Sequence, residues 1–572
     1  MATEATTTEG CATVDVRAVT RGLRSGAASE AWMAAWLGAA AADRRAFLAA
    51  LTAQAQGRGA SCPGTTSATV SPYKSFIGAH VNAGRPALAI ETQGQRQVLS
   101  YRELDALTGR LARGWMRAGL KPGAVVAIVV SPGIAYVVSL LTCFRMGLVA
   151  APIPPCGRAW VGRRLKLLSP DGIFAGADAG AFGDTWPAPL LPWVRDDDST
   201  TAGPWPYGAA APLLRLFSPY AAGPLEPIDV SAGTLLDGAR CDALLTFHLD
   251  PSDVIAAPGW DAAASQPTLL FAALMAGACW AEIPEASALA RPGVFADFAV
   301  TVLGVSPPLH ERLVTSKDWE AAPLRAWFRH LLDPTMELWD DLIQQAASRG
   351  VPSFSVVLAP CAGGAVVFSP PALCPRPFLC WPVPARAHQL TQLGSERLQA
   401  LAESGLFTPF IDEKPAKGVP AVVLAQHGAA HYFAGCVQVG RAGQVYPEEE
   451  VVALVESHPL VKQATAVVTP RRRLGDAHVT LLVFCGPGGA DTIEGPSHEL
   501  RSLIKAGLGA AQLPDRIEWL PLRPRSSDKG IDRAWCRGQY LSGALRAKSS
   551  SRMFRVLSQL AEIAELHLGG QA

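Results

Sequence analysis

The chain has 572 residues, of which 49% are hydrophobic and 17% are charged, and its formal net charge is +1. This composition is sufficient for a large buried core and excludes an intrinsically disordered chain. Basic residues are scattered, apart from the run Arg471–Arg473, and this distribution argues against binding to nucleic acid or to an anionic membrane.

The sequence offers no targeting or membrane segment. The first ten residues, MATEATTTEG, lack a basic region followed by an apolar run. No stretch reaches the ~18 uninterrupted apolar residues that a membrane span requires. The 12 cysteines contain no C-x-x-C pair and are expected to be reduced thiols. We therefore expect a cytoplasmic protein.

Residues 1–70 are predicted to form a helical extension followed by a linker. Apolar residues recur there at intervals close to 3.6 residues, and the stretch from Gly57 to Pro72 is rich in Gly, Ser, Thr and Pro. The apolar positions of the extension are Trp32, Trp36, Leu37, Phe47, Leu48 and Leu51.

From Pro86 the sequence alternates between short apolar runs and longer amphipathic segments. The runs ALAIE, AVVAIVV and LVAAPIPP alternate with two helical segments, an order that predicts a parallel sheet wound with helices. Ser100 and Glu103 form a capping box for the first helix, and Gly119 is placed to end it. The second helix is expected to run to Gly147. The fold class is therefore α/β.

This region resembles the adenylate-forming superfamily of acyl-CoA synthetases, luciferases and peptide-synthetase adenylation domains. The resemblance rests on LSYRELDALTGRLARGWMRAGLKPGAVVAIVVSPG and on FRMGLVAAPIPP. The segment Asp253–Pro284 is similar to the helix and strand that lead to the family's substrate pocket. The segment from Val445, and DKGIDR at Asp528–Arg533, resemble the family's small C-terminal domain and its terminal lysine motif.

The resemblance implies a large α/β domain over residues 71–434 and a small, mobile α+β domain over 435–543, joined by a hinge near 435–443. Residues 544–572 are expected to contain a single amphipathic helix, whose apolar face usually covers a core. That face consists of Met553, Val556, Leu557, Leu560, Ile563 and Leu566.

The segment Leu216–Leu236 occupies the position of the family's ATP-binding loop, approximately T-S-G-T-T-G-x-P-K-G-V-x-x-S-H. Such a loop binds phosphates through small residues, hydroxyl groups and a lysine. In this chain only Ser218, Gly223 and Ser231 agree with the pattern, and we take these three as candidate nucleotide contacts.

The differences in this loop oppose phosphate binding. Pro219 and Pro227 have no N–H to donate, and alanines at 221 and 222 lack hydroxyls. Glu226 stands where the family has its lysine. A carboxylate about 4 Å from a phosphate oxygen costs roughly 4 kcal/mol at an effective dielectric constant near 20. We therefore expect an impaired ATP site.

The family's other nucleotide contacts are altered as well. Leu358–Pro371 contains no carboxylate where the family has its magnesium-binding glutamate. Asp412 is a candidate for the ribose contact after a one-residue shift, and Arg441 could replace the hinge arginine if the hinge is shortened. Lys529 retains the surroundings of the family's catalytic lysine, whose ammonium neutralises the carboxylate and the α-phosphate; an exposed loop lysine is the alternative.

Two further groups have open interpretations. Trp260, Ala273 and Cys279 could line an apolar or aromatic substrate pocket, but they could equally belong to a core strand and helix. His427 and His431 stand four residues apart, but their segment resembles a strand and offers no acidic third ligand. We expect no metal site at these histidines.

Three functions remain open. The first is an acid–thiol ligase with an impaired ATP site, which would use ATP and Mg²⁺ to activate a small carboxylic acid for the thiol of coenzyme A or of a carrier-protein phosphopantetheine. The second is an ATP-independent acyltransferase that moves an acyl group from a thioester between coenzyme A and an acyl carrier protein. The third is a non-catalytic homologue that binds a partner or an acyl ligand.

Overall fold

The computed structural model describes residues 69–550 apart from 93, 177–185, 194–202, 221–224, 261–264, 317, 334–349, 370–378, 384–389, 393–403, 412–413, 416–417, 420–421, 428–429, 437–439, 442–443, 471–476, 486–493, 523 and 528–529. The helices expected before residue 69 and after residue 550 lie outside the described residues.

The chain forms two compact units. The first contains Met1–Pro154 and Leu167–Gln438, and the second contains Pro155–Lys166 and Val439–Ala572. The division after Gln438 falls within the hinge expected from the sequence, and the mobility of the small domain stays a prediction. The inclusion of Pro155–Lys166 in the second unit was not expected, because this segment lies between two strands of the first.

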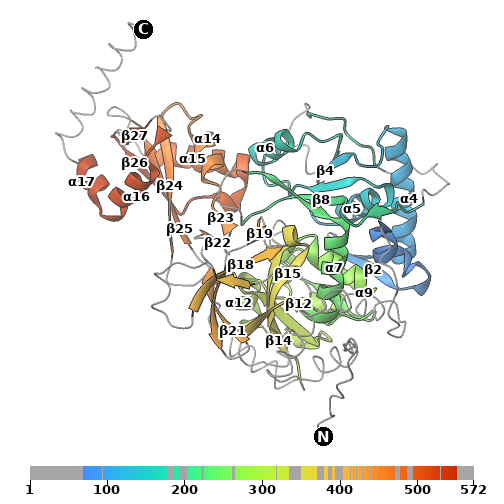
Figure 1. Cartoon of the computed structure of the whole chain (residues 1–572). Coiled ribbons are helices and arrows are strands. Elements are labelled where there is room, and N and C mark those ends of the chain that lie inside the picture. Colours follow the sequence, from blue (N-terminus) through green and yellow to red (C-terminus); the bar gives the residue numbers. More distant parts are fainter. Residues whose placement is uncertain are drawn as a thin grey trace. The chain divides into compact units, whose positions relative to one another are not determined.

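The smaller sheet of the first unit has the order β6–β4–β5–β8–β9. Its strands β4 and β8 are labelled in Figure 1. Strands β6, β4, β5 and β8 are parallel, and β9 returns antiparallel to β8. The strands are β4 (Val125–Val129), β5 (Val149–Pro152), β6 (Gly172–Ala175), β8 (Pro212–Phe217) and β9 (Pro227–Ser231).

Two helices of the first unit begin and end where local signals predict. Helix α4 (Tyr101–Arg117) begins with the expected capping box, in which Ser100 Oγ accepts from the Glu103 amide and the Glu103 carboxylate accepts from the Ser100 amide at 2.7 Å. It is followed by Gly119, whose φ of 90° suits glycine. Helix α5 (Ile134–Met146) ends at a left-handed Gly147. These sequence predictions are confirmed.

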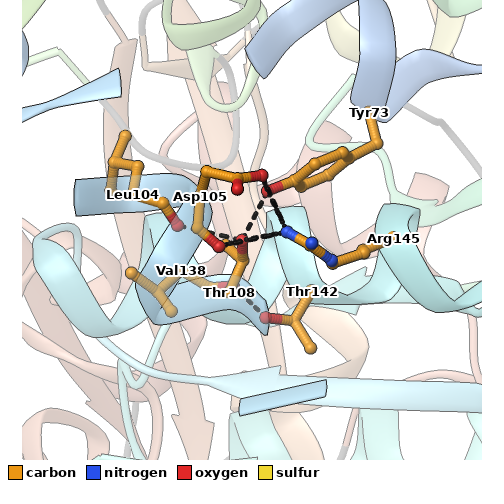
Figure 2. A network of polar contacts seen from close by, with 7 residues as sticks. All are labelled: Tyr73, Leu104, Asp105, Thr108, Val138, Thr142 and Arg145. Carbon is orange, nitrogen blue, oxygen red and sulfur yellow. Dashed lines mark hydrogen bonds and ion pairs between the residues drawn. The ribbon is translucent and has the colours of Figure 1, made fainter. Parts of the chain in front are cut away.

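A buried polar network joins α4 and α5 (Figure 2). Arg145 Nη1 donates to Asp105 Oδ1 at 2.8 Å and to the Tyr73 hydroxyl at 2.7 Å. The Tyr73 hydroxyl donates to Asp105 Oδ1 at 2.8 Å and lies 2.5 Å from Thr108 Oγ1. The guanidinium also lies over the Tyr73 ring, 4.8 Å from its centroid. The buried guanidinium therefore has a carboxylate, a hydroxyl and an aromatic ring as partners.

The larger sheet has fourteen strands among the described residues, in the order β17–β18–β20–β21–β16–β15–β14–β13–β12–β10–β11–β2–β3, with β19 on β18. Six neighbouring strands from β14 to β2 are parallel, and the pairings beyond them are antiparallel. The parallel strands are β2 (Pro86–Thr92), β11 (Cys279–Glu282), β10 (Val254–Ala256), β12 (Val302–Gly304), β13 (Ala326–His330) and β14 (Ser353–Ala359).

The remaining strands of this sheet are β3 (Gln95–Ser100), β15 (Gly364–Ser369), β16 (Leu379–Pro382), β17 (Leu390–Gln392), β18 (Ser404–Ile411), β19 (Lys414–Pro415), β20 (Val422–His427) and β21 (Ala430–Cys436). The expectation that Pro86–Thr92 shares one parallel sheet with the next two strands is wrong. Strand β2 forms a hairpin with β3 and pairs with β11, whereas β4 and β5 belong to the smaller sheet. The pattern of a single strand does not identify its partners, so the sequence order could not separate the sheets.

The helices of the first unit that follow the smaller sheet are α7 (Ala232–Cys241), α9 (Thr268–Ala276), α10 (Glu285–Ala290), α11 (Val294–Asp297) and α12 (Pro307–Thr315). Alternate residues of the parallel strands enter two core clusters, because successive side chains of a strand point to opposite faces. Leu88 and Trp280 belong to one cluster, whereas Ala89 and Cys279 belong to the other.

Short elements complete the first unit. They are β1 (Thr69–Val70), β7 (Tyr207–Gly208), η1 (Lys74–Gly78), η2 (Val81–Ala83), η4 (Asp242–Thr246), η5 (Asp318–Ala321) and η6 (Pro360–Ala362).

The second unit has a three-stranded sheet, β24–β25–β26, with one antiparallel and one parallel pairing. Ala159 and Trp160 of α6 pack on its core, and Arg164 of α6 forms a buried ion pair with Glu450 at 2.9 Å. The elements are α6 (Arg158–Leu168), β22 (Gly440–Arg441), β23 (Gln444–Val445), α14 (Glu448–Val455), β24 (Gln463–Pro470), β25 (Ala477–Phe484), α15 (Glu494–Leu508), η8 (Ala510–Gln512), β26 (Arg516–Leu520), β27 (Ser526–Ser527), β28 (Gly530–Ile531), α16 (Arg533–Leu541) and α17 (Ala544–Ser550).

Candidate functional site

The carboxyl ends of the parallel strands form one edge of the larger sheet. In open α/β sheets, ligands bind outside this edge. Trp260 follows β10, Glu282 ends β11, Ser306 follows β12 and His330 ends β13. This edge is therefore the candidate location of a functional site.

Trp260 lies in an aromatic group at this edge. Its ring meets the Phe328 ring edge to face, with centroids 4.9 Å apart, and meets the His330 ring at 5.6 Å in a similar geometry. Phe328 in turn stacks on Phe354 at 5.3 Å. The indole thus packs against two rings of β13, and one of these packs in turn on a ring of β14.

His330 is held as a neutral side chain. Burial, reinforced by the positive charge of Arg329, lowers its pKa to about 3. The Leu332 amide lies 3.2 Å from Nδ1 and the Leu358 amide lies 3.1 Å from Nε2. A neutral imidazole accepts at only one ring nitrogen, so either tautomer satisfies only one of these two amides. With this pKa, His330 is not a proton carrier near neutral pH.

Ser218, the first of the three loop residues that match the family pattern, forms hydrogen bonds within the protein. Its Oγ donates to the Gly418 carbonyl at 2.5 Å and accepts from the Tyr220 amide at 3.0 Å. Cys361 lies next to it, and burial raises the pKa of that thiol to about 12, a shift that a hydrogen bond with Ser218 opposes. Segments far apart in the sequence therefore meet at this hydroxyl.

The fit around Gly418 is close. This glycine has φ 72°, and a methyl group added to it would lie 2.6 Å from Ser218 Cβ and 2.5 Å from Ile228 Cδ1. Tyr220 is buried in a cluster with Leu331, Val357 and other apolar residues. The described start of the loop is therefore part of the core.

Ser231 caps a helix. Its Oγ accepts from the Thr234 amide at 3.2 Å and begins α7. Arg215 of β8 and Asp229 of β9 form a two-point ion pair across the hairpin, with N–O distances of 2.6 and 3.0 Å. Glu226 is exposed. Gly223 lies outside the described residues.

The predicted pocket residues do not share one face. Trp260 packs against the cluster that contains Ala273, whereas Cys279 lies in the cluster on the other side of the sheet. Burial raises the pKa of the Cys279 thiol to about 12, so this residue is an inert thiol near neutral pH. Whether any of the three contacts substrate stays a prediction.

Of the other predicted site residues, Asp412 and Lys529 lie outside the described residues, and Arg441 belongs to β22. His427 and His431 lie in the paired strands β20 and β21.

Among the described residues, no group of three His, Cys, Asp or Glu side chains could hold a metal ion. The Ser218 hydroxyl already has a donor and an acceptor partner, and the nearby described charge of the loop, Glu226, is negative.

Two acidic residues at the sheet edge were missed by the sequence reasoning. Burial raises the pKa of Glu282 to about 7, and burial also raises the pKa of Asp333 to about 7 despite the positive charge of Arg329. An acidic residue that ends an apolar strand, as in CWAEIP, is the sequence signal that could have identified Glu282.

Comparison with known proteins agrees with this architecture. Residues 78–168 match the family described as AMP-binding enzyme. No curated protein matches the sequence. Among the helices of the described part, none is both long and apolar enough to span a membrane.

Solved structures share the fold at low sequence identity. A double mutant of o-succinylbenzoate CoA synthetase from Bacillus subtilis, bound to a product analogue, has a TM-score of 0.61 at 13% identity, with 82% of this chain and 98% of that chain covered. An acyl-CoA synthetase from Brucella canis has a TM-score of 0.54 at 17% identity, with 88% and 100% covered.

A third similar structure is an artificially fused adenylation–PCP di-domain from Klebsiella oxytoca, with a TM-score of 0.60 at 16% identity and with 79% of this chain and 94% of that chain covered. Residues 78–168 thus resemble AMP-binding enzymes in sequence, and over most of its length the chain has the fold of adenylate-forming enzymes.

Proposed function

We propose that this protein is an acid–thiol ligase-like protein with an impaired ATP site. The observation that carries the proposal is the packing of Ser218, whose hydroxyl bonds to the Gly418 carbonyl and the Tyr220 amide instead of facing solvent. To donate to a phosphate oxygen, the Ser218 hydroxyl would have to give up its bond to the Gly418 carbonyl.

The chemistry of the loop supports the same conclusion. Its prolines have no N–H to donate, and Glu226 adds a negative charge where a triphosphate needs a positive one. Lys529, Asp412, Arg441 and Gly223 are the remaining candidates for a nucleotide or acyl-phosphate contact.

The expected ligands are a small carboxylic acid or its thioester. The thiol would be that of coenzyme A or of phosphopantetheine on an acyl carrier protein, in the cytoplasm. The similar structures include a CoA synthetase bound to a product analogue and an adenylation domain fused to a PCP domain, which makes both thiols reasonable to test.

ATP-independent acyl transfer is the second candidate. The Ser218 contacts favour acyl transfer, because they engage the start of the nucleotide loop. They do not include the residues near Trp260 at the edge of the larger sheet. A protein of this kind would move an acyl group between coenzyme A and a carrier-protein thiol.

Isothermal titration with ATP and Mg²⁺ tests the impaired site. We expect weak or undetectable binding to the full-length protein. A dissociation constant in the micromolar range would contradict the proposal and would mean that Ser218 is released when the nucleotide binds. The variant Glu226→Lys restores the family's charge at that position and is expected to bind ATP more tightly than the wild type.

A carrier-loading assay separates the candidate functions. A purified carrier protein receives either a free acid with ATP or a preformed acyl-CoA, and its mass is followed. Loading from the free acid that falls about 100- to 1000-fold in Lys529→Ala supports the ligase. Loading only from acyl-CoA, unchanged in Lys529→Ala, supports the transferase. No loading from either donor, over a broad panel of acids, supports a non-catalytic homologue.

A further inference from the structure

Helix α6 connects two strands of the smaller sheet and also forms part of the second unit. Strands β5 and β6 both pair in parallel with β4, and parallel strands need a crossover connection. Short segments, residues 153–157 and 169–171, join α6 to these two strands. Pro155–Lys166 nevertheless forms one compact unit with Val439–Ala572. The chain therefore passes between the two units three times, at both ends of this segment and after Gln438.

Basic side chains of α6 pair with the start of α14. Arg164 Nη1 donates to Glu450 Oε1 at 2.9 Å and Nη2 donates to Oε2 at 3.4 Å. These two side chains are only 5% and 8% exposed, and the guanidinium lies over the Trp160 ring, 3.1 Å from its centroid. Arg163 donates to Glu449 at 3.2 Å in a more exposed pair. Because a buried charge without its partner is costly, the Arg164–Glu450 pair holds α6 on α14.

The backbone just before α6 contacts the end of α15 directly. A methyl group added to Gly157 would lie 2.4 Å from the Gly507 carbonyl carbon. One added to Gly509, whose φ is 92°, would lie 2.9 Å from the Cys156 carbonyl oxygen. Two backbones approach this closely only where side chains are missing. The contact with α15 is therefore independent of the ion pair with α14.

Two faces of α6 are buried. Ala159 and Trp160, one turn before the two arginines, pack on the core of the second unit. A separate face carries apolar residues at a spacing of four and then three positions, each of which is at most 4% exposed. Among the described residues, this face does not belong to the core clusters of the second unit. It consists of Val161, Leu165 and Leu168.

We propose that α6 is a latch that controls the movement of the second unit. While α6 is docked, segments of a few residues tie this unit to β5 and β6, and each residue reaches at most about 3.6 Å. A rotation about the hinge near residues 435–443 then requires α6 to leave α14 and α15. The Arg164–Glu450 pair is the lock, because either side chain alone would be an uncompensated buried charge.

Limited digestion of the full-length protein with trypsin measures the release of α6. The cleavage sites in this helix are Arg158, Arg163, Arg164 and Lys166. We expect slow cleavage in the wild type. Glu450→Gln keeps all four sites and removes the charge that pairs with the arginine, so it should speed cleavage in α6 tenfold or more. Cleavage follows the population of the open form when opening and closing are fast, and the masses of the fragments identify the sites.

Glu449→Gln is the matched control, because it makes the same change of charge one residue away, in the more exposed pair with Arg163. It should change cleavage in α6 by about twofold or less. Lys505 on α15 is exposed and reports opening of the whole second unit. If Glu450→Gln leaves cleavage in α6 unchanged, or speeds cleavage at Lys505 equally, α6 is not a separate latch.

An engineered disulfide tests the docked contact and its effect on movement. A Cβ added to Gly507 would lie 3.6 Å from Ala159 Cβ, which suits a disulfide, and only the tip of Leu454 must move aside. Ala159→Cys with Gly507→Cys should therefore form the link on oxidation. Cys156→Ser removes the exposed native thiol from this background.

Small-angle X-ray scattering then reads the movement of the second unit. Glu450→Gln should have a larger radius of gyration than the wild type. The disulfide, added to that variant, should return the radius to the wild-type value, and dithiothreitol should raise it again. Failure of the link to form in otherwise wild-type protein, or equal radii in the oxidised and reduced variant, would overturn the latch. These measurements need neither ATP nor a thiol substrate, so they are independent of the proposed function.

Discussion

Two polar regions lie against the same hydrophobic cluster of the first unit, and they differ in how their charges are paired. Around Arg145, the guanidinium contacts the Asp105 carboxylate, two hydroxyl groups and the Tyr73 ring (Figure 2). Around Glu282, the carboxylate accepts a hydrogen bond from Trp280 Nε1 at 3.0 Å. Tyr73 and Trp280 are members of the same cluster.

The difference separates a charge that has an ion pair from one that has a single hydrogen bond. The Arg145 contacts join α4 to α5 and offset the cost of burying a charge. The partly buried Glu282 carboxylate accepts a hydrogen bond from Trp280 Nε1, and no ion pair is found for it among the described residues. Substitutions can test this contrast directly.

The largest effect is expected at Arg145. Arg145→Met leaves Asp105 without its ion pair and the Tyr73 hydroxyl without a donor, and we expect a loss of about 3 to 5 kcal/mol in the free energy of unfolding. Urea denaturation measures it. The control Arg240→Met removes a more exposed pair with Asp237 and should cost about 1 kcal/mol or less. Equal costs for the two variants would contradict the structural role of the network.

The opposite sign is expected at Glu282. Its pKa is raised from 4.5 to about 7 in the folded protein, so the folded state binds more protons than the unfolded state between these values. Stability contributed through this group therefore falls as pH rises from about 4.5 to about 7 and stays low above that range. Glu282→Gln should remove this fall and make the protein more stable at pH 8 than the wild type. If Glu282→Gln is less stable than the wild type at pH 8, the Glu282 carboxylate stabilises the folded protein, as the Arg145 network does.

We expect Ser218, like Arg145, to stabilise the folded protein. Ser218→Ala removes the bonds to the Gly418 carbonyl and the Tyr220 amide and is expected to cost about 1 to 3 kcal/mol. Calorimetric unfolding measures the cost, and ATP titration of the same variant is expected to match the wild type. Reduced ATP binding with unchanged stability would instead make Ser218 a nucleotide contact.

The smallest effect is expected at Ser100, which makes an exposed polar contact at the start of α4, the helix that contains Asp105. Ser100→Ala removes one side of the capping box and should cost about 1 kcal/mol. The comparison with Arg145→Met shows how much of the network's effect comes from burial. Ser100→Asp, which also caps helices, should recover most of the loss.

Local signals in the sequence predicted local structure correctly. Ser100 with Glu103 and the later Gly119 marked both ends of α4, and Gly147 marked the end of α5. These signals work because capping bonds and left-handed glycines involve residues only a few positions apart. The resemblance of residues 78–168 to AMP-binding enzymes was also present in the sequence.

Pairings between distant segments were decided only by the tertiary structure. Strand β2 pairs with β11 and not with β4, α6 belongs to the second unit, and Ser218 meets Gly418 across 200 positions. Sequence patterns report the period and burial of a segment but not the identity of its neighbours. The sequence likewise did not show which partners Glu282 has, because its partners depend on all the segments packed around its side chain. The sequence alone showed which residue types the loop contains. The contacts of its first serine, Ser218, with Gly418 and Tyr220 could be seen only in the tertiary structure.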